Sequence, residues 1–433
     1  MTMYTCGPTV YAPAHIGNLR TFVVSDWWRR TLQWNGYQVE SAMNVTDVDD
    51  KTIKGSQITG LPLSSFTSQY EKTFFVDLKL LNIEQPEIIP HATEYIKNMI
   101  EMIELLLAKD FAYQAEDGIY FRIDKSNNYG LLAGLKKRTD IQSRIKSDQY
   151  DKETPSDFAL WKFWQESDGE VGWNAPFGRG RPGWHIECSA MIRAVFGDTI
   201  DLHLGGTDLI FPHHTNEIAQ SEAVTGQPLA NHWLHIAFVN MAGGKMAKSE
   251  GNVVTLADLT ARGISPLVYR YWLLSAHYRT LMNFSWEALE SSATAFKKLQ
   301  NRISDLQETV RHSVWDKKGK SIEQYSNKFT EAINNDLNLP VALSVVWQLL
   351  DDGSVSPSDM LATILEFDKV LGLDLISVTQ PLDIPPEVKQ LLVDRESARG
   401  AGDFARADQL RQQITTAGYT IDDTSEGPRL RKI

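Results

Sequence analysis

The first part of the chain has the hydrophobic pattern of a strand, a helix and a second strand. Residues 3–10 are mostly apolar and reach a turn near Gly7. Residues 21–34 carry large apolar side chains at helical spacing, and residues 37–44 have the pattern of another strand. Two strands joined through a helix predict a βαβ unit, and such units build parallel sheets.

The carboxyl ends of these two strands carry the first candidate functional residues. Ligands of open parallel sheets bind just beyond the carboxyl ends of the strands. Cys6, Gly7, Thr9 and Thr46 stand at these ends in the predicted sheet. We therefore expect them to face one common site.

The α/β pattern is then interrupted. Residues 63–109 have a helical pattern, and Ile119, Phe121 and Ile123 alternate with other residues as in a half-buried strand. Residues 118–183 contain many Gly, Pro and Asp residues between short apolar runs. This composition predicts an insertion between two halves of one nucleotide-binding domain.

The second half of that domain follows the insertion. The pattern resumes at Trp184 and predicts a strand at residues 199–204. A helix is predicted to start near Pro212, with the proline in its first turn, and the half ends in a loop at residues 243–251. Residues 258–373 are then mostly helical in pattern.

The C-terminal part predicts a helical bundle and a small last unit. Apolar helices are expected at residues 340–350 and 360–370, and Pro385 precedes the last unit. A strand is expected at residues 419–421. It follows a helix whose apolar stripe consists of Phe404, Ala407, Leu410 and Ile414.

Composition narrows the class of protein only a little. The chain has 433 residues, 42% of them apolar, which is enough for several domains. The net charge of -12 argues against a general nucleic-acid coat but leaves a local tRNA-binding face open. Two cysteines make no disulfide framework, and neither a transmembrane run nor a secretory signal is evident. We expect a cytoplasmic protein.

The two cysteines and a His-x-x-x-Glu pair suggest a metal site. His213 and Glu217 are four residues apart, so in a helix they share one face. Taken alone, such a pair is more often solvated, and Cys6 and Cys188 are more often small core residues. Together they offer two thiolates, an imidazole and a carboxylate, which are the donors that zinc prefers.

Two other short motifs suggest a nucleotide site. His15-Ile16-Gly17-Asn18 places a glycine at a helix start, where phosphate approaches the backbone and negative charge is favoured. His15 and Asn18 can donate hydrogen bonds to phosphate. Lys245 and Lys248, on a glycine-flanked loop, can meet charge that develops at an α-phosphate. Each motif alone is weak, since Lys-x-x-Lys is usually a solvated face.

Taken in order, these motifs resemble those of the cysteinyl-tRNA synthetases, a branch of the class I aminoacyl-tRNA synthetases. The resemblance extends from Met3 to the C-terminus and is densest up to about Asn252. The stretches that carry it are Cys6-Gly7-Pro8-Thr9-Val10-Tyr11, His15-Ile16-Gly17-Asn18, Asn44-Val45-Thr46-Asp47-Val48-Asp49-Asp50-Lys51, Gly180-Arg181-Pro182-Gly183-Trp184-His185-Ile186-Glu187-Cys188-Ser189 and Phe211-Pro212-His213-His214.

The resemblance implies one zinc ion per chain, with the substrate cysteine adding its own thiolate. Zinc selects sulfur over the poorly ionised hydroxyl of serine, so a separate editing site becomes unnecessary. The implied zinc ligands are Cys6, Cys188, His213 and Glu217. The implied amino-acid pocket consists of Gly7, Thr9, Thr46, Trp184, His203 and Asp208.

Asp208 would bind the substrate ammonium, although a turn residue after Gly205-Gly206 is the plainer interpretation. Ordinary core packing likewise remains open for Trp184 and His203. ATP would contact His15, Gly17, Asn18, Lys245 and Lys248.

The implied reaction is that of a cysteine–tRNA ligase. The carboxylate of L-cysteine attacks the α-phosphate of ATP, with Mg²⁺ carrying phosphate charge, and gives cysteinyl-adenylate and pyrophosphate. The terminal ribose of tRNA(Cys) then takes the acyl group. His15, Asn18, Lys245 and Lys248 would act catalytically by positioning and charge neutralisation. A monomer is expected.

The implied fold is α/β, with a Rossmann-like class I synthetase catalytic domain, an inserted connective subdomain, a C-terminal helical bundle and a small anticodon-binding unit. Arg399, Asp408 and Asp423 are candidates for reading the anticodon, with solvated surface charges as the equal alternative. The expected segments are 1–117 and 184–257 for the catalytic halves, 118–183 for the insertion, 258–320 for linking helices that contact the tRNA stem, 321–375 for the bundle and 376–433 for the anticodon unit.

Three positions depart from the family pattern. Asn18 stands where the class has a second histidine, Ala247 replaces a serine, and Thr215 stands where Glu is usual. All implied ligands and both lysines are retained, which argues against a catalytically dead paralogue.

A cysteine ligase of the mycothiol type, acting on a small amino-sugar acceptor, is the close alternative. Such enzymes share the zinc and nucleotide motifs but lack the C-terminal anticodon unit. The sequence after Pro386 matches that unit and therefore favours tRNA.

Overall fold

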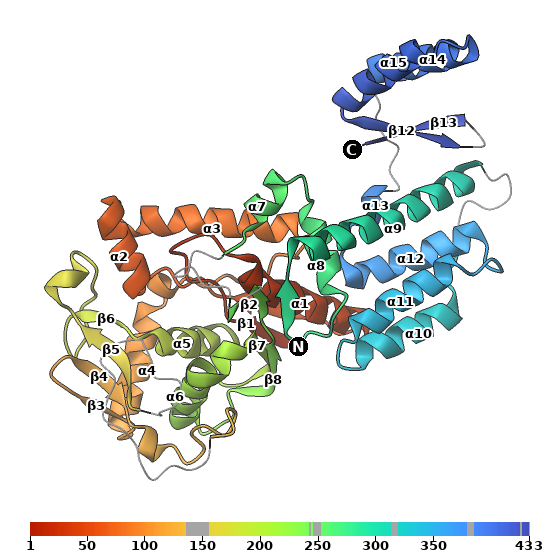
Figure 1. The fold of residues 1–433 in the computed structure, drawn as a ribbon. Helices are drawn as coiled ribbons and strands as arrows, with labels where there is room; N and C mark the ends of the chain where they lie inside the picture. Colours follow the sequence, from red (N-terminus) through yellow and green to blue (C-terminus); the bar gives the residue numbers. More distant parts are fainter. Residues whose placement is uncertain are drawn as a thin grey trace. The chain divides into compact units, whose positions relative to one another are not determined.

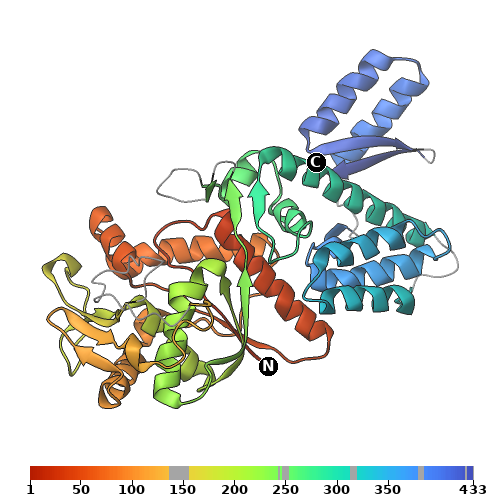
Figure 2. The same ribbon diagram turned by 60° about the horizontal axis from the view of Figure 1, so that its bottom comes forward.

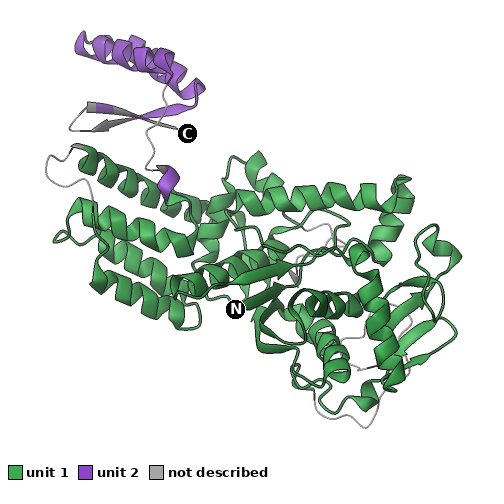
Figure 3. Ribbon diagram, turned by 180° about the vertical axis from the view of Figure 1, so that it is seen from behind, with its two compact units in different colours: residues 1–375 green, residues 376–433 purple. Residues whose placement is uncertain are grey.

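A computed structural model describes residues 1–135, 156–241, 244–245, 253–312, 319–378, 385–424 and 427–432. The chain divides into two compact units, Met1–Leu375 and Ile376–Ile433 (Figure 3). None of the described helices is long and apolar enough to cross a bilayer. The finer division into six segments stays a prediction.

A four-stranded parallel sheet forms the centre of the first unit (Figure 1). Met3 pairs with Ser41 on one side and with Leu202 on the other, so strands from both halves of the domain are interleaved. The predicted parallel sheet is therefore confirmed. Its strands, in spatial order, are β2 (Glu40–Met43), β1 (Thr2–Thr5), β7 (Ile200–Gly206) and β8 (Ala230–Ile236).

Helices cover both faces of this sheet, as is usual for parallel strands. Met3 and Leu202 point to the face on which α1 (Ile16–Trp34) packs. Tyr4 and Ile200 point to the opposite face, in one core with Met191 of α5 (Trp184–Phe196). Neighbouring residues of β1 thus face opposite cores, and both faces of the sheet are dry.

The first strand and helix differ in extent from their prediction. Strand β1 ends at Thr5, and the chain then turns because Gly7 lies against Asn44. The Gly7 amide donates to Asn44 Oδ1 at 2.8 Å. Helix α1 begins at Ile16 rather than at residue 21, since the ring of His15 caps it by accepting the Asn18 amide.

The region predicted as one helical stretch at residues 63–109 contains two helices. They are α3 (Leu63–Leu80) and α4 (Ile96–Ala108), and α2 (Asp50–Thr59) precedes them. The segment between α3 and α4 runs along the edge of the central sheet, where Ile88 bridges to Ala42 and His91 to Val45. This extended edge separates the two helices.

An antiparallel sheet is formed by three strands of the predicted insertion and by β3 (Ala112–Gln114), which lies before residue 118. The interpretation of this region as half-buried was wrong, since Tyr120 is only 2% exposed and stacks on Tyr113, while Ile119 and Phe121 fill the core on the other face. Ile123 lies in a 3₁₀ turn beyond the strand. The strands are β3 (Ala112–Gln114), β4 (Gly118–Phe121), β5 (Phe158–Phe163) and β6 (Gly180–Pro182).

A small sheet and a set of helices complete the first unit (Figure 2). In the small sheet, β9 (Val239–Met241) pairs with β10 (Gly244–Lys245) and β11 (Met282–Phe284). Both apolar helices predicted near residues 340–350 and 360–370 are confirmed. The helices are α6 (Thr215–Thr225), α7 (Leu256–Ala261), α8 (Pro266–Leu273), α9 (Trp286–His312), α10 (Glu323–Asn334), α11 (Leu339–Leu350), α12 (Pro357–Leu371) and α13 (Leu375–Val378), the last of which spans the division between units.

The second unit packs two helices on a hairpin around Val388, Ile414 and Tyr419. The predicted apolar stripe is correct except at Phe404, which is 67% exposed. Phe404 is the first residue of its helix, next to the turn, where the described residues do not cover it. The elements are α14 (Pro386–Gly400), α15 (Phe404–Thr416), β12 (Tyr419–Thr424) and β13 (Gly427–Lys432).

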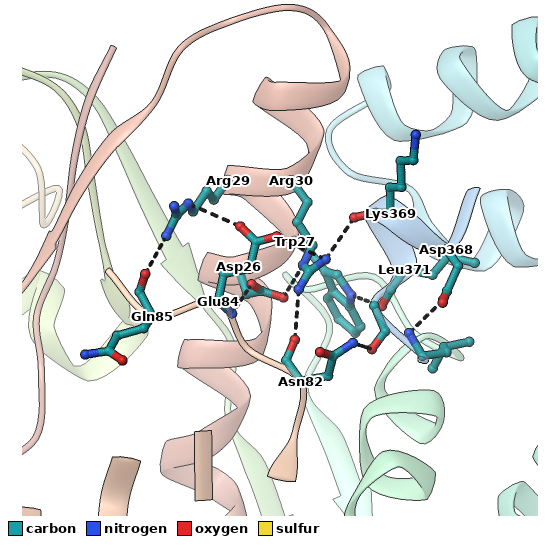
Figure 4. Close-up of polar contacts among 12 residues, drawn as sticks. Asp26, Trp27, Arg29, Arg30, Asn82, Glu84, Gln85, Asp368, Lys369 and Leu371 are labelled. Atoms are coloured by element: carbon teal, nitrogen blue, oxygen red, sulfur yellow. Dashed lines mark hydrogen bonds and ion pairs between the residues drawn. The ribbon is translucent and has the colours of Figure 1, made fainter. Parts of the chain in front are cut away.

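A buried charge cluster joins α1 to α8 and α12 of the same unit (Figure 4). Asp26 Oδ2 accepts from Arg30 Nε at 2.8 Å and from Arg270 Nη2 at 2.5 Å. Its other oxygen accepts the Glu84 amide at 2.9 Å. Because all three ionic side chains are buried, each charge depends on the others for compensation.

The same cluster holds the C-terminal end of α12. Arg30 donates to the carbonyl of Lys369 at 3.0 Å, and Trp27 donates its indole N–H to the carbonyl of Leu371 at 2.9 Å (Figure 4). Arg270 donates to the Leu371 carbonyl as well. The helix end that would otherwise leave carbonyls unpaired is thus bound to α1 and α8.

Asp26→Ala removes the buried carboxylate that Arg30 and Arg270 share, and it leaves Arg30 with only the partly exposed Glu84 as an ion-pair partner among the described residues. We expect it to destabilise the protein by about 3–5 kcal/mol, which urea unfolding followed by tryptophan fluorescence measures. Glu366→Ala is the control, because Glu366 pairs with Lys369 at the surface and its loss should cost less than about 1 kcal/mol. Equal effects of the two substitutions would contradict this assignment.

Candidate active site

Four potential metal ligands converge from four segments of the first unit. Cys6 follows β1, Cys188 lies in α5, His213 precedes α6 and Glu217 lies in its first turn. One ligand atom from each lies within 4.8 Å of the others, and all four residues are buried. The sequence placed these residues up to 211 positions apart, and the fold brings them to one point.

The local backbone at His213 differs from the prediction. Helix α6 begins at Thr215, and Pro212 lies in the π-helical segment Ile210–His214 rather than in the first α-helical turn. His213 and Glu217 nevertheless meet, with 3.0 Å between His213 Nε2 and Glu217 Oε1.

The pKa values of the four residues shift in different directions, which favours an ionised Cys188 and Glu217, a neutral Cys6 and a protonated His213. A hydrogen bond from Cys6 lowers the pKa of Cys188 to about 6, while burial and the neighbouring Cys188 raise that of Cys6 well above its usual range. Burial opposes charge on His213, but Glu217 and Cys188 outweigh it and raise its pKa to about 10. Burial also opposes charge on Glu217, yet the adjacent His203 and His213 hold its pKa well below the usual range.

The donor chemistry fits a zinc ion. Two sulfurs, one imidazole nitrogen and one carboxylate oxygen are the ligand types that zinc binds, and four is its usual number in protein sites. Ionised sulfur and carboxylate in a dry interior need positive charge beside them, which a bound divalent ion would supply.

A second, overlapping donor set lies beside the first. It combines Cys6 and Glu217 with His203 and His214, again within 4.8 Å. His214 Nε2 is 3.4 Å from Cys6 Sγ, and His203 Nε2 is 2.9 Å from Glu217 Oε2. His214 is a residue that the sequence reasoning missed, although its position directly after His213 was a signal. The first set has two sulfurs and the second has one.

A pocket of about 440 Å³ runs from this donor group to the start of α1. It is lined by eight of the predicted site residues: Cys6, Gly7, Thr9, His15, Gly17, Asn18, Trp184 and Asp208. The pocket therefore has a thiol at one end and a helix N-terminus at the other, as expected if an amino acid and a nucleotide meet in it.

Two residues predicted for the amino-acid pocket, Thr46 and His203, do not line it. Thr46 and His203 are buried behind it, where Thr46 donates to Glu187 and His203 stacks on Trp233. Lys245 lies in β10, and Lys248 lies outside the described residues.

The end of the pocket at the start of α1 is shaped by a capping box. His15 Nδ1 accepts the Asn18 amide at 3.2 Å, and Asn18 Oδ1 accepts the His15 amide at 3.4 Å. A Cβ atom at Gly17 would lie 3.0 Å from the His15 ring, so glycine leaves room for that ring. These two hydrogen bonds fix the motif at the N-terminus of α1.

Arg20 is a buried residue of α1 that sequence reasoning missed. Its guanidinium donates to the carbonyls of Ala237, Phe238, His277, Tyr278 and Thr280 at 2.7–3.4 Å. Ala237 and Phe238 line the pocket opposite the start of α1. A lone arginine within an apolar helix pattern was the available signal.

The anticodon candidates all lie in the second unit. Arg399 is exposed on α14 and 3.8 Å from Glu396, and Asp408 is exposed on α15. Asp423 lies in β12, opposite Pro428 of β13.

The fold matches that of class I synthetases. Mycobacterium tuberculosis methionyl-tRNA synthetase, solved with methionyl-adenylate, is 16% identical and superposes with a TM-score of 0.62 over 88% of this chain and 91% of that one. A leucyl-tRNA synthetase from Agrobacterium radiobacter, in a ternary complex, gives 0.63 at 9% identity, with 88% and 85% covered. Residues 1–294 match the family model for the class I (C) tRNA synthetase catalytic domain. The protein is therefore a class I aminoacyl-tRNA synthetase.

Relatives with higher sequence identity show which family within this class the chain belongs to. The cysteine–tRNA ligase of Chlamydia pneumoniae is 43% identical over all of this chain and 94% of that protein, and that of Brachyspira hyodysenteriae is 39% identical over 99% and 94%. Residues 382–429 match the cysteinyl-tRNA ligase anticodon-binding domain. The chain belongs to the cysteine–tRNA ligase family.

Gly7→Ala tests the close approach at the thiol end of the pocket. The new Cβ would lie 1.6 Å from the backbone oxygen of Asn44, so one of the two segments must move. We expect ATP–pyrophosphate exchange to fall at least about tenfold, since small displacements of positioning groups are costly.

Gly353→Ala is the matched control, because its Cβ would meet nothing within 4 Å. Wild-type exchange in Gly7→Ala would show that the close approach is dispensable.

Proposed function

We propose that the protein activates L-cysteine with ATP and transfers it to the 3′ end of tRNA(Cys). Family membership supports the overall reaction. The observation that carries the cysteine-specific part is the buried group of sulfur, nitrogen and oxygen donors at one end of a pocket whose other end is a helix N-terminus. The amino acid binds at the donor group and ATP binds at the start of α1.

Cys6, Cys188, His213 and Glu217 would hold the zinc ion. When bound, zinc offers a coordination position that suits the soft thiolate of cysteine and is poorly filled by the hydroxyl of serine. The protein orients these ligands through further contacts, with His203 bonded to Glu217 and His185 Nδ1 lying 2.9 Å from His213 Nδ1. Discrimination against serine then arises in binding itself.

The rest of the amino-acid end positions the substrate. The carboxylate of Asp208 lines the pocket and would bind the ammonium group. The ring of Trp184 packs on His213 with 4.4 Å between centroids, so it fixes both a ligand and the pocket wall. Gly7 and Thr9 border the space for the main chain of the amino acid, and Thr46 and His203 support the site from behind.

The nucleotide end acts by positioning and by charge. The pocket-facing start of α1, with His15, Gly17 and Asn18, binds the phosphates. Lys245 and Lys248 would neutralise the charge that develops when the cysteine carboxylate attacks the α-phosphate. Mg²⁺ brought by ATP would carry part of the remaining phosphate charge. The reaction requires no nucleophile from the protein.

The acceptor is tRNA rather than an amino sugar. The match of residues 382–429 to an anticodon-binding domain supports this choice over the mycothiol type of ligase. Arg399, Asp408 and Asp423 remain our candidates for anticodon contacts. We place the activity in the cytoplasm and assign it to a monomer.

Cysteine-dependent ATP–pyrophosphate exchange tests the role of zinc. We expect about one zinc per chain, exchange with cysteine but not with serine, and loss of exchange when a chelator removes the metal. Cys188→Ser should lose zinc and activity together. Ser189→Ala, at the next position of α5, should keep both. Equal activation of serine, or full activity of Cys188→Ser, would sink the zinc-selection mechanism.

Charging assays with two acceptors separate the alternatives. We expect acylation of tRNA(Cys) and none of glucosaminyl-inositol. Removing residues 376–433, which form a unit of their own, should weaken acylation but leave the exchange reaction within about twofold, since activation needs only the first unit. Acylation of the amino sugar alone would overturn the assignment to tRNA.

A further inference from the structure

A cation and two aromatic rings line the wall of the pocket without a role in the activation step. Lys51, in the first turn of α2, is exposed, and its Nζ lies 5.0 Å from the centroid of the Tyr11 ring. Tyr70 of α3 lines the same pocket. Among the described residues, Lys51 forms no ion pair, so its charge is available to a ligand.

The backbone that carries Lys51 is held firmly. Asp49 caps α2 by accepting the Thr52 amide at 2.7 Å. Asp50 binds Lys162 at 3.0 Å and pairs with Arg181, which ties the same turn to the inserted sheet. Lys51, the next residue, is thereby presented to the pocket while its two predecessors make structural contacts.

The aromatic partners are also fixed. Tyr70 packs edge-to-face on Phe66 with 5.2 Å between centroids, and Phe74 does the same with Phe22 at 4.9 Å. Phe66, Tyr70 and Phe74 are spaced four apart and so lie on one face of α3. Of this face, Tyr70 and Phe74 line the pocket, and together with Tyr11 they give it an aromatic border beside the lysine.

We propose that Lys51, Tyr11 and Tyr70 bind the unpaired 3′ end of the tRNA. Tyr11 and Tyr70 are half-buried. A lysine beside aromatic rings at a pocket wall is the combination by which proteins hold single-stranded nucleic acid, with the cation on a phosphate and the rings against bases. The segment from Gly7 to Tyr11 borders the pocket, so a strand held here brings its terminal ribose toward the activated carboxyl group. This inference rests on the proposed function and adds a subsite to it.

Because the subsite serves only the transfer step, its loss should separate the two half-reactions. In the zinc-loaded full chain, Lys51→Ala should lower kcat/KM for tRNA(Cys) about tenfold while exchange stays within about twofold. Lys54→Ala, on the same helix but away from the pocket, should alter neither. Lys51→Arg should recover most of the loss, since it keeps the charge.

The rings can be tested in the same way. Tyr11→Leu should lower charging about tenfold or more, and Tyr11→Phe should retain it, because stacking requires the ring and not the hydroxyl.

Two binding measurements identify the contact between Lys51 and the tRNA: the salt dependence of the affinity, and the affinity for a truncated transcript. Loss of one phosphate contact with a single strand should reduce the slope of log affinity against log salt by about 0.7. Wild type and Lys51→Ala should bind equally to a transcript that lacks its unpaired 3′ nucleotides.

Two outcomes would overturn the proposal: a parallel loss of exchange and charging, which would assign Lys51 to activation, or charging by Lys51→Ala equal to that of Lys54→Ala. Failure of the wild type to charge any tRNA would instead refute the proposed function.

Discussion

The interaction on which the rest of the catalytic unit depends is the convergence of Cys6, Cys188, His213 and Glu217 in a dry interior. These residues come from the end of β1, from α5 and from the segment that leads into α6. Cys188 and Glu217, the two members whose pKa values are lowered, are packed within 4.8 Å of the other donors and have lost their hydration, so their negative charge needs compensation. A bound zinc ion would provide that compensation. In the proposed mechanism, the preference of this ion for sulfur would let one small pocket choose cysteine over serine without a second site.

Helix α1 connects this chemistry to the remainder of the unit. Its first turn presents His15 and Asn18 to the pocket, and Arg20 binds five carbonyls that include the opposite pocket wall. Further along, Asp26 and Arg30 join the buried cluster that holds α12 and α8 (Figure 4). The helix that forms the nucleotide end is therefore anchored along its length. A binding site built on such an element keeps its geometry when substrates enter.

The sequence was informative wherever periodicity or a specific set of residue types was involved. The parallel sheet followed from one βαβ pattern, and two thiols with a His-x-x-x-Glu pair pointed to a single buried group. Local backbone detail was less accessible. The end of β1 at Thr5 depends on contact with Asn44, and the segment Ile210–His214 is kinked at Phe211, which has extended backbone angles. Phe404 completed an apolar stripe in sequence but lies at a helix end that nothing described covers.

Residues whose role depends on their neighbours in space were hardest to identify. Lys51 and Tyr11 are forty positions apart, and only the fold places the cation over the ring. The sequence reasoning likewise selected His213 and not the adjacent His214. In the structure, His214 contacts the thiol of Cys6, and His213 contacts Glu217.

X-ray absorption at the zinc edge tests the central claim most directly. The zinc-loaded protein should show two sulfur ligands at about 2.3 Å, from Cys6 and Cys188, and the number should rise to three when cysteine is added but not when serine is added. One sulfur ligand in the resting protein would instead indicate the overlapping set with His203 and His214. A sulfur count that does not change with cysteine would contradict selection by thiolate coordination.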